Sequence, residues 1–355
     1  MSNRLTTGDA PAAGSPQRVA YLVMSHTRPL QVLRLVRALR ALSPEALIVV
    51  HHDQRVSRLE GAHVQAAGGG SLLSAPYRVQ WGGISQVDAL LWTLRWLEDN
   101  VDYDWVVHLS GQDYPVRPLR EYETRLCCGE ADAYLRFARV GTEADLTGRW
   151  QEEAVRRYFY RYRYIPAALA RPLLHIRFGD QTRSMAKPND AGSTNATASA
   201  PSGARPRRPW AVAKVVPDGR IGIGLPARRT PFTDGYSCYK GSYWVTLSRR
   251  AVRALLHARC SRPEVYEYFR RTWIPDESFV ATLLGNDDSI RLSRDEYRYL
   301  DWTRHTAHPD VLTSADLPRV VASGRYLARK FDMSTDPAVL DALDELLGLT
   351  AVPEE

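Results

Sequence analysis

The sequence lacks a long apolar segment. No run of about 18 consecutive apolar residues occurs, so no part of the chain predicts a transmembrane helix. The segment from Met1 to Pro16 is small and polar and has no apolar core of the kind that a signal peptide needs. We therefore expect a cytoplasmic protein with a disordered leader over residues 1–17.

Cysteine is also scarce. The four cysteines, Cys127, Cys128, Cys238 and Cys260, lack metal-ligand spacing, and neighbours such as Cys127 and Cys128 rarely form a structural disulfide. Reduced thiols agree with a cytoplasmic location, where the glycosylation sequon at Asn195 would stay unmodified.

Acidic residues are fewer than basic residues in this sequence. The 355 residues carry 47 Lys and Arg against 40 Asp and Glu, which gives a net charge of +7. Such a chain favours anions: nucleotide phosphates, nucleic acid or an acidic membrane face. Because the arginines are dispersed, solvated helix faces explain most of them, and nucleic acid is not expected as a partner. Peripheral association with a membrane stays open.

The first part of the chain predicts a nucleotide-binding α/β sheet. A buried strand at 19–25 is followed by a helical repeat of leucines, and a second strand at 46–50 leads into Asp53. Ligands of such sheets bind at the carboxyl ends of the strands. His26 and Asp53 are placed to meet a nucleoside there, although a turn-capping role suits either residue equally well.

Further strands and helices alternate up to residue 140. We expect a strand at 77–83, a helix at 85–98, a central strand at 105–110 and a strand at 133–137. The polar loop 111–115, which contains Asp113, follows the central strand at the edge where ligands bind. Residues 18–140 thus form the predicted nucleotide-binding half.

Residues 141–350 are predicted to form the acceptor and catalytic half of the same domain. Aromatic and basic residues over 147–177 could bind sugar rings or nucleic acid, although an interdomain packing surface is the more common explanation. Residues 182–208 suggest a flexible insertion. The remaining expected elements are a strand at 241–248, helices at 249–257 and 336–347, a strand at 297–302, a short helix within 308–324, and a closing segment at 325–332.

The stretch from Trp273 to Leu284 carries the main catalytic candidate. Ile274 and Pro275 predict an extended approach, Asp276 suits an N-cap, and Glu277 would lie in the first turn of a helix. A carboxylate on such a rigid backbone can act as a general base. From this pattern alone, the simpler reading is favoured, in which Asp276 and Glu277 only complement the helix dipole.

Two acidic motifs could hold a metal ion. Asp102 and Asp104 have an Asp-x-Asp spacing, but they precede the central strand at the edge away from the ligand, so a solvated turn is favoured. Asp287 and Asp288 follow a turn sequence. Nothing in the chain requires a divalent metal.

Without a metal, side chains must neutralise a leaving diphosphate. Lys330, with Arg304 or Arg329, could do so. An isolated lysine in this position would more often be an ordinary surface residue.

Four motifs in order resemble the core-2/I-branching β-1,6-N-acetylglucosaminyltransferase family, which includes the peptide O-xylosyltransferases. They are the segments Leu109–Pro115, Gly241–Trp244, Pro275–Phe279 and Ala328–Asp332. The resemblance spans about residues 19–347 and implies a GT-A-like α/β fold, inversion at the anomeric carbon and independence from metal ions.

The resemblance also implies roles for single residues. Glu277 matches the general base, Lys330 the lysine that binds the UDP diphosphate, and Asp53 the acid that meets the uridine. A family arginine shares the phosphate role, and Arg304 is the best local candidate. Contacts with the acceptor or the donor sugar are expected from Asp113, Tyr243, Trp244 and Asp276. Trp244 could instead be a core aromatic, and Asp113 could brace its loop.

The predicted reaction is a single displacement from a UDP-sugar to an acceptor hydroxyl, with no cofactor. GlcNAc and xylose are both open as the transferred sugar, and a carbohydrate, glycoside or glycolipid is open as the acceptor. The eukaryotic members are Golgi proteins with a membrane anchor and many disulfides, and we expect neither feature here, so a secretory glycoprotein acceptor is not expected. The alternative is a non-catalytic protein of the same fold that binds a nucleotide or an acidic polymer.

Overall fold

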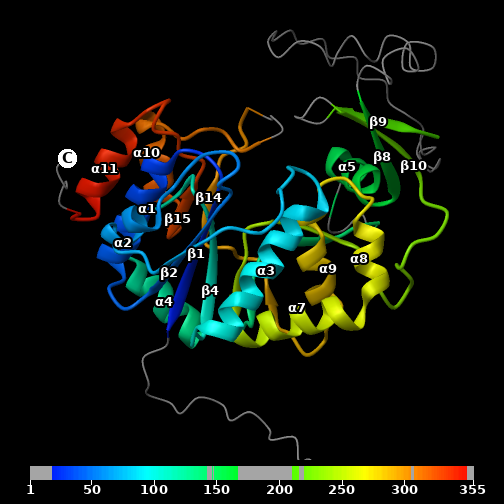
Figure 1. Ribbon diagram of the computed structural model, residues 1–355, viewed down its shortest axis with the longest axis horizontal. Coiled ribbons are helices and arrows are strands. Elements are labelled where there is room, and N and C mark those ends of the chain that lie inside the picture. The colour runs from blue at the N-terminus through cyan, green and yellow to red at the C-terminus, as the bar shows by residue number, and fades with distance from the viewer. Residues whose placement is uncertain are drawn as a thin grey trace, which may run out of the picture.

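A seven-stranded sheet forms the centre of the computed structural model (Figure 1). The structure describes residues 18–141, 146, 148–166, 210–215, 220–304 and 308–349. The predicted leader and the predicted insertion with Asn195 lie outside these residues.

The sheet is parallel at one end and mixed at the other. Strands β1 (Val19–Ser25), β2 (Leu47–His52), β3 (Ser71–Leu73) and β4 (Trp105–Ser110) run parallel. Beyond β4, β12 (Thr246–Ser248) runs antiparallel to both β4 and β6 (Ala133–Tyr134), and β13 (Leu292–Ser293) is parallel to β6. The predicted α/β fold with a mixed sheet is confirmed.

Both faces of the sheet are buried. Along β1, Val19, Tyr21 and Val23 face one hydrophobic core, whereas the residues between them face the other. Burial on two faces explains why the sequence of β1 is a continuous apolar run and does not alternate with polar residues.

Helices cover each face. One core is covered by α1 (Pro29–Leu42), α2 (Gly61–Ala66), α4 (Leu119–Cys128), α10 (Leu317–Ala322) and α11 (Ala338–Leu346). The other core is covered by α3 (Ile84–Asn100), α5 (Gly148–Tyr158), α7 (Arg249–Ser261), α8 (Pro263–Phe269) and α9 (Phe279–Gly285).

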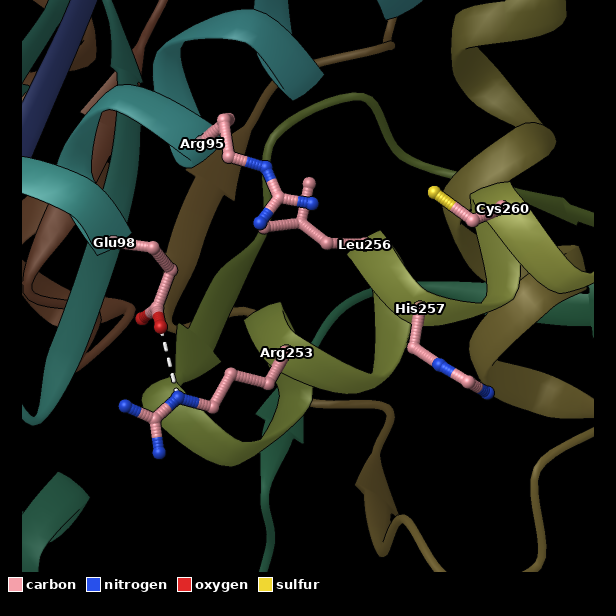
Figure 2. A pocket seen from close by; sticks show the side chains of 6 residues that line it. All are labelled: Arg95, Glu98, Arg253, Leu256, His257 and Cys260. Carbon is pink, nitrogen blue, oxygen red and sulfur yellow. Dashed lines mark hydrogen bonds and ion pairs between the residues drawn. The ribbon is translucent and has the colours of Figure 1, made fainter.

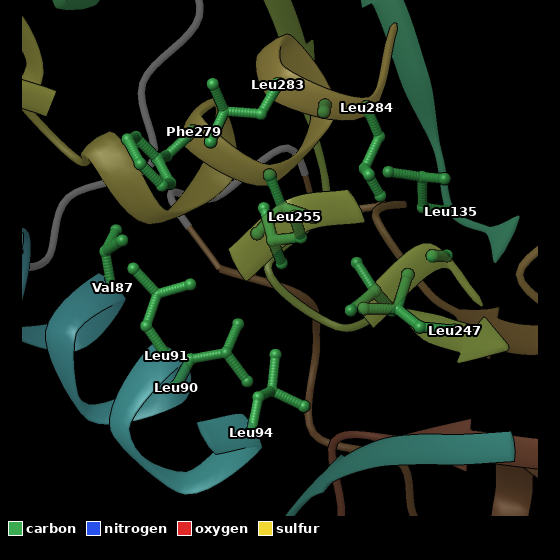
Figure 3. Packing of buried hydrophobic residues seen from close by; sticks show 14 of the residues in the cluster. Val87, Leu90, Leu91, Leu94, Leu135, Leu247, Leu255, Phe279, Leu283 and Leu284 are labelled. Atoms are coloured by element: carbon green, nitrogen blue, oxygen red, sulfur yellow. The ribbon is translucent and has the colours of Figure 1, made fainter. Parts of the chain in front are cut away.

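The second core fixes the position of α9. Figure 3 shows Leu90 and Leu91 of α3 and Leu255 of α7 pointing towards Phe279 and Leu283. All five side chains are buried, so truncation of one to alanine would cost about 2–5 kcal/mol of stability. The backbone next to Glu277 is therefore held rigidly.

Three small sheets complete the fold. Strands β8 (Tyr160–Pro166), β10 (Arg220–Pro226) and β9 (Val212–Val215) are antiparallel, and β11 (Tyr239–Gly241) pairs with β7 (Phe137–Arg139). Strand β15 (Leu327–Arg329) lies between β14 (Arg298–Leu300) and β5 (Asp113–Pro115). Both predicted halves contribute strands to the seven-stranded sheet and to this last sheet.

Some predicted strands are wrong in detail. Residues 77–83 form no strand, because the chain turns at Gly82, whose φ is +70°. The segments predicted at 133–137 and 241–248 each divide between two sheets. The loop predicted at 111–115 becomes strand β5 at Asp113, since its partner β15 comes from the distant C-terminal part.

No helix in the described part of the chain is long and apolar enough to cross a bilayer. The four cysteines are free thiols.

Candidate active site

The carboxyl ends of β1 and β2 bring His26 and Asp53 together. Asp53 is buried, and its Oδ1 accepts a hydrogen bond of 3.1 Å from the Arg55 backbone N–H, whereas Oδ2 has no hydrogen-bond partner in the described structure. Burial lowers the pKa of His26, Asp53 opposes that shift, and the cations Arg28 and Lys330 add to it. Lys330 thus lies at the same edge as these two residues.

Strand β15 delivers Arg329 and Lys330 to that edge. The strand is anchored on both sides by β14 and β5, and the Phe331 backbone N–H donates to the Gln112 carbonyl at 2.9 Å. Arg329 is only 9% exposed, and its guanidinium lies 4.4 Å from the centre of the Trp244 ring. Its Nε and Nη1 have no hydrogen-bond partner among the described residues.

Lys330 is partly buried and forms no ion pair with any described carboxylate. Burial lowers its pKa, as do the neighbouring charges of Arg329 and Arg28, while Asp332 opposes them. Asp332 itself pairs with Arg28 at 2.5 Å. Arg329 and Lys330 are therefore two cations without a direct carboxylate partner among the described residues.

Asp113 acts as a brace. Its Oδ2 accepts hydrogen bonds from the Ser110 backbone N–H at 2.7 Å and from the Ser110 hydroxyl, and its Oδ1 lies 2.8 Å from Arg298 Nε in a fully buried ion pair. Arg298 also donates to the His108 carbonyl at 2.8 Å. Of the two predicted roles for Asp113, the geometry favours loop bracing over sugar contact.

Tyr243 and Trp244 differ in exposure. Tyr243 is buried, and its hydroxyl donates to the Gln86 carbonyl at 2.9 Å, so the residue belongs to the core. Trp244 is partly exposed and packs between Arg329 and the His108 ring, whose centre is 4.8 Å away. Trp244 can therefore form a wall of the site, whereas Tyr243 supports that wall.

The backbone at Glu277 differs from the prediction. Residues Pro275–Glu277 form a 3-10 turn (η2), and Ser278 precedes α9, so Asp276 is not an N-cap and Glu277 precedes the helix. Ile274 is left-handed, with φ 50° and ψ 58°, where an extended conformation was expected. Proline disfavours the right-handed helical conformation for the residue before it. The expected extended conformation and the observed left-handed conformation both avoid it.

Two cations hold Glu277. Arg157 Nη1 lies 2.5 Å and Lys240 Nζ lies 3.1 Å from the same carboxylate oxygen, Oε2. Burial alone would raise the pKa of Glu277, but Lys240 and Arg157 outweigh it and hold this pKa below its usual range. Glu277 is therefore ionised at neutral pH, as a general base must be.

The pKa of Asp276 shifts in the opposite direction. It is buried, its Oδ1 has no hydrogen-bond partner among the described residues, and burial together with the charge of Glu277 raises the pKa of Asp276 to about 7. A buried carboxyl in this position supports the turn. Sugar contact by Asp276 stays a prediction.

Glu277 and Lys330 both influence the pKa of His308. Burial lowers the pKa of His308, Lys330 lowers it further, and Glu277 opposes this shift. Burial lowers the pKa of Arg329 as well, and the charge of Glu277 opposes that shift. The catalytic candidate and the phosphate candidates are thus close enough in space to influence the same imidazole.

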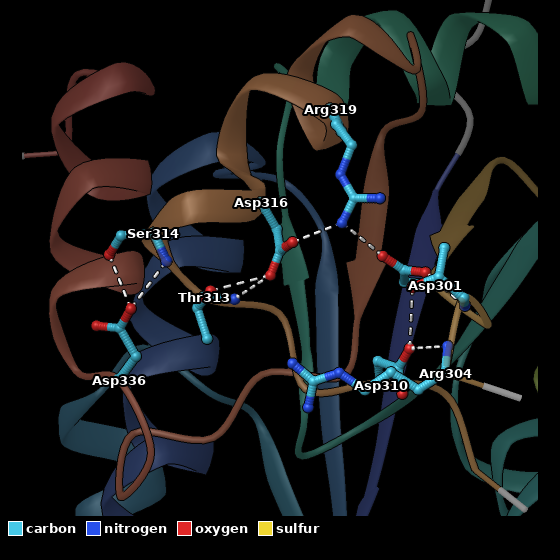
Figure 4. Close-up of polar contacts among 9 residues, drawn as sticks. Asp301, Arg304, Asp310, Thr313, Ser314, Asp316, Arg319 and Asp336 are labelled. Carbon is cyan, nitrogen blue, oxygen red and sulfur yellow. Dashed lines mark hydrogen bonds and ion pairs between the residues drawn. The ribbon is translucent and has the colours of Figure 1, made fainter. Parts of the chain in front are cut away.

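Arg304 lies in a separate polar network, shown in Figure 4. Its backbone N–H donates to Asp310 Oδ2 at 3.0 Å, and its side chain is exposed. Nearby, Arg319 pairs with Asp301 at 2.8 Å and with Asp316 at 2.6 Å. A phosphate role for Arg304 stays a prediction, and Arg329 is the better placed arginine.

The Asp-x-Asp motif lies at the amino end of β4. Asp102 pairs with Arg18 at 2.9 Å and with Arg249 at 2.7 Å, and Asp104 accepts a hydrogen bond from the Arg18 backbone N–H. These contacts agree with the predicted solvated turn. Within the described ranges, no group of three or more His, Cys, Asp or Glu side chains could hold a metal ion.

A pocket of about 270 Å³ lies elsewhere, between α3 and α7 (Figure 2). Its lining residues are Arg95, Glu98, Arg253, Leu256, His257 and Cys260. None of these residues was predicted to take part in catalysis, and Glu98 is already paired with Arg253 at 2.8 Å.

Sequence reasoning missed Arg157, Lys240 and Arg298. Arg157 belongs to an aromatic and basic stretch, and no local pattern distinguishes it from Arg156. Lys240 precedes the Gly-Ser-x-Trp motif, which was the one signal near it. Gly241 allows the close approach there, because a Cβ at this position would lie 2.8 Å from the Ala281 Cβ of α9.

Solved structures share a limited likeness with the chain. The galactosyltransferase LgtC in complex with donor and acceptor sugar analogs aligns with a TM-score of 0.36 and 13% identity, over 94% of this chain and 98% of that one. The mouse xyloside xylosyltransferase 1, apo form, aligns with a TM-score of 0.32 and 11% identity, over 87% of this chain and 97% of that one. Because these scores are low, the family assignment rests on sequence.

The sequence comparisons agree with one another. The xylosyltransferase oxt of Drosophila pseudoobscura pseudoobscura is 24% identical over 373 residues, covering 97% of this chain and 35% of that protein. Xylosyltransferase 2 of Homo sapiens is 32% identical over 117 residues, covering 31% of this chain and 13% of that protein. The chain spans about a third of the length of the oxt relatives. The model of the Core-2/I-Branching enzyme family matches residues 19–188 and 219–320, more than half of the sequence, and the chain belongs to that family.

Proposed function

We propose that the protein is an inverting, metal-independent glycosyltransferase that moves GlcNAc or xylose from a UDP-sugar to an acceptor hydroxyl. The names of the curated relatives, which are xylosyltransferases, support the reaction class. One observation carries the proposal: Arg157 and Lys240 hold Glu277 at 2.5 Å and 3.1 Å, whereas Arg329 and Lys330 form no ion pair with any described carboxylate.

Glu277 is the proposed general base. It removes the proton from the acceptor hydroxyl while that oxygen forms a bond to the anomeric carbon. The bond between this carbon and the diphosphate oxygen breaks on the opposite face, and its electron pair leaves with UDP. Inversion follows from this single displacement.

Arg329 and Lys330 are the proposed diphosphate clamp. Negative charge develops on the leaving oxygen, and fixed cations stabilise it without reorganisation, since β15 already holds both residues in place. The Arg329 guanidinium forms no ion pair with any described carboxylate, so its charge is left for a phosphate group. No divalent ion is needed for this role.

His26 and Asp53 are the proposed nucleoside contacts. Both residues lie at the carboxyl ends of parallel strands, where the ligands of such sheets bind. Trp244 offers an apolar face beside Arg329, against which a sugar ring can pack. The acceptor is proposed to be a carbohydrate, a glycoside or a glycolipid.

A panel of UDP-sugars tests the proposal. We expect the purified protein to hydrolyse one of them slowly, to turn it over faster when an acceptor is present, and to keep its activity in EDTA. Loss of activity on chelation that added Mn²⁺ or Mg²⁺ restores would contradict metal independence. Turnover with none of the sugars would contradict the function.

A further inference from the structure

Glu277 is held at one oxygen only. Arg157 and Lys240 both contact Oε2, at 2.5 Å and 3.1 Å, and no described residue forms a hydrogen bond or an ion pair with Oε1. The Glu277 side chain is still 34% exposed. Oε1 is therefore the oxygen that an incoming group can reach.

The two cations are themselves fixed. The Arg157 side chain is 9% exposed and also pairs with Glu153 one turn earlier in α5. The Lys240 side chain is 12% exposed, and its ammonium lies 5.4 Å from the centre of the Trp150 ring. Because they come from α5 and β11, a rotation of the carboxylate would break contacts with two separate elements.

We propose that Arg157 and Lys240 are positioning residues that hold Oε2 of Glu277, leave Oε1 as the proton acceptor, and keep the carboxylate charged when the donor diphosphate binds nearby. This inference rests on the proposed function. A bound diphosphate adds negative charge close to Glu277, and a nearby like charge favours the protonated carboxyl, which cannot act as a base.

Charged and titratable groups reach Glu277 from every element around it. They are Glu153, Arg157 and Tyr158 on α5, Lys240 on β11, Asp276 on η2, Arg329 on β15, and His308. Among the described residues, only Arg157 and Lys240 make direct contact with the carboxylate. These two residues therefore provide its local charge balance.

The test is the pH dependence of kcat/KM for Lys240→Met. Removal of the ammonium raises the pKa of Glu277, so the acid limb of the profile moves to higher pH by about one unit. Activity falls most at acidic pH and least at alkaline pH, where Glu277 is ionised in both proteins. Lys240→Arg restores the wild-type limb, because it keeps the charge.

Arg156→Met is the matched control. Arg156 is adjacent to Arg157 but exposed, and its side chain pairs with Glu152 at 3.1 Å. We expect its profile to match the wild type. If Lys240→Met does not fold, Lys240→Gln and Arg157→Gln, which also remove a positive charge, are measured in its place, with circular dichroism as the check on folding.

The outcomes separate the two proposals. A wild-type protein that turns over no UDP-sugar overturns the proposed function. A wild-type protein that is active, with a Lys240→Met or substitute variant whose activity falls equally at all pH values or whose acid limb does not move, overturns only the positioning role.

Discussion

Two pairs of cations flank the proposed site, and they differ in what they contact. Arg157 and Lys240 are both paired with carboxylates, Arg157 with Glu153 and Glu277 and Lys240 with Glu277. Arg329 and Lys330 have no such partner within the described parts of the chain, although Arg329 is almost completely buried.

The difference indicates how each pair is used. A buried charge without a partner is costly, so Arg329 destabilises the fold unless a ligand compensates it. A paired cation lowers the energy of the carboxylate that it contacts. This contrast supports the proposal that the first pair serves Glu277 and that the second pair binds the diphosphate of the donor.

The largest expected effect comes from Glu277→Gln. Glutamine keeps the size of the side chain but cannot accept the proton, so transfer falls by about 10²-fold or more. UDP binding stays close to wild type, because the second pair of cations is unchanged. Transfer rates and calorimetric titration with UDP give the two measurements.

This variant also tests the alternative of a non-catalytic binding protein. Equal biological effect with and without Glu277 would favour that alternative over the transferase.

The next largest effect is expected at the unmatched cations. Lys330→Gln and Arg329→Gln each remove a charged contact with phosphate, worth about 1.5–3 kcal/mol, so the Kd for UDP rises roughly 10- to 150-fold. Arg319→Gln is the control, because Arg319 is already paired with Asp301 and Asp316. If all three variants bind UDP equally well, the absence of a carboxylate partner does not mark Arg329 and Lys330 as phosphate-binding residues.

Arg304→Gln decides which arginine shares the phosphate role. The structure favours Arg329, so we expect the Arg304 variant to bind UDP within a few-fold of wild type. A loss as large as that of Lys330→Gln would instead support the original sequence prediction.

A smaller effect is expected on stability at Asp276. The pKa of Asp276 is raised to about 7, so its favourable contribution is complete at low pH and is lost as the pH rises from about 4 to about 7. Asparagine does not ionise. Asp276→Asn should therefore gain stability over wild type as the pH rises, by at least about 1 kcal/mol or about 2 °C in Tm between pH 5 and pH 8. An equal difference in Tm at both pH values would contradict a raised pKa.

The smallest effect is expected at Asp102. Its ion pairs with Arg18 and Arg249 are largely exposed, so Asp102→Asn should cost at most about 1 kcal/mol of stability and leave transfer unchanged. A large loss of transfer in this variant would revive a metal-binding role for the motif.

At the parallel end of the fold, the sequence predicts the longer elements well, but it misses the three-residue strand β3. Strands β1 and β4 and helix α3 lie where periodicity places them, because buried strands and amphipathic helices leave strong local patterns. It predicts short strands poorly. Strands β5 and β15 have three residues each and exist because they pair with each other across the chain, which no local pattern encodes.

The site shows the same division. Glu277, Asp53 and Lys330 stand in motifs or at strand ends, so their types and positions are readable from the sequence. Arg157 and Lys240 depend on the packing of α5 and β11 against the turn at Glu277, and such contacts become visible only in three dimensions.

Ion pairs connect the C-terminal part of the described chain to its N-terminal part. Arg34 of α1 pairs with Asp341 at 2.6 Å and with Asp344 at 2.7 Å in α11, and Arg28 pairs with Asp332. Ribosomal synthesis proceeds from the amino terminus, so a growing polypeptide already carries His26 and Asp53 long before Arg329 and Lys330 emerge. If these residues bind the donor as proposed, a nascent chain acquires its affinity for nucleotide late, when the C-terminal contacts form.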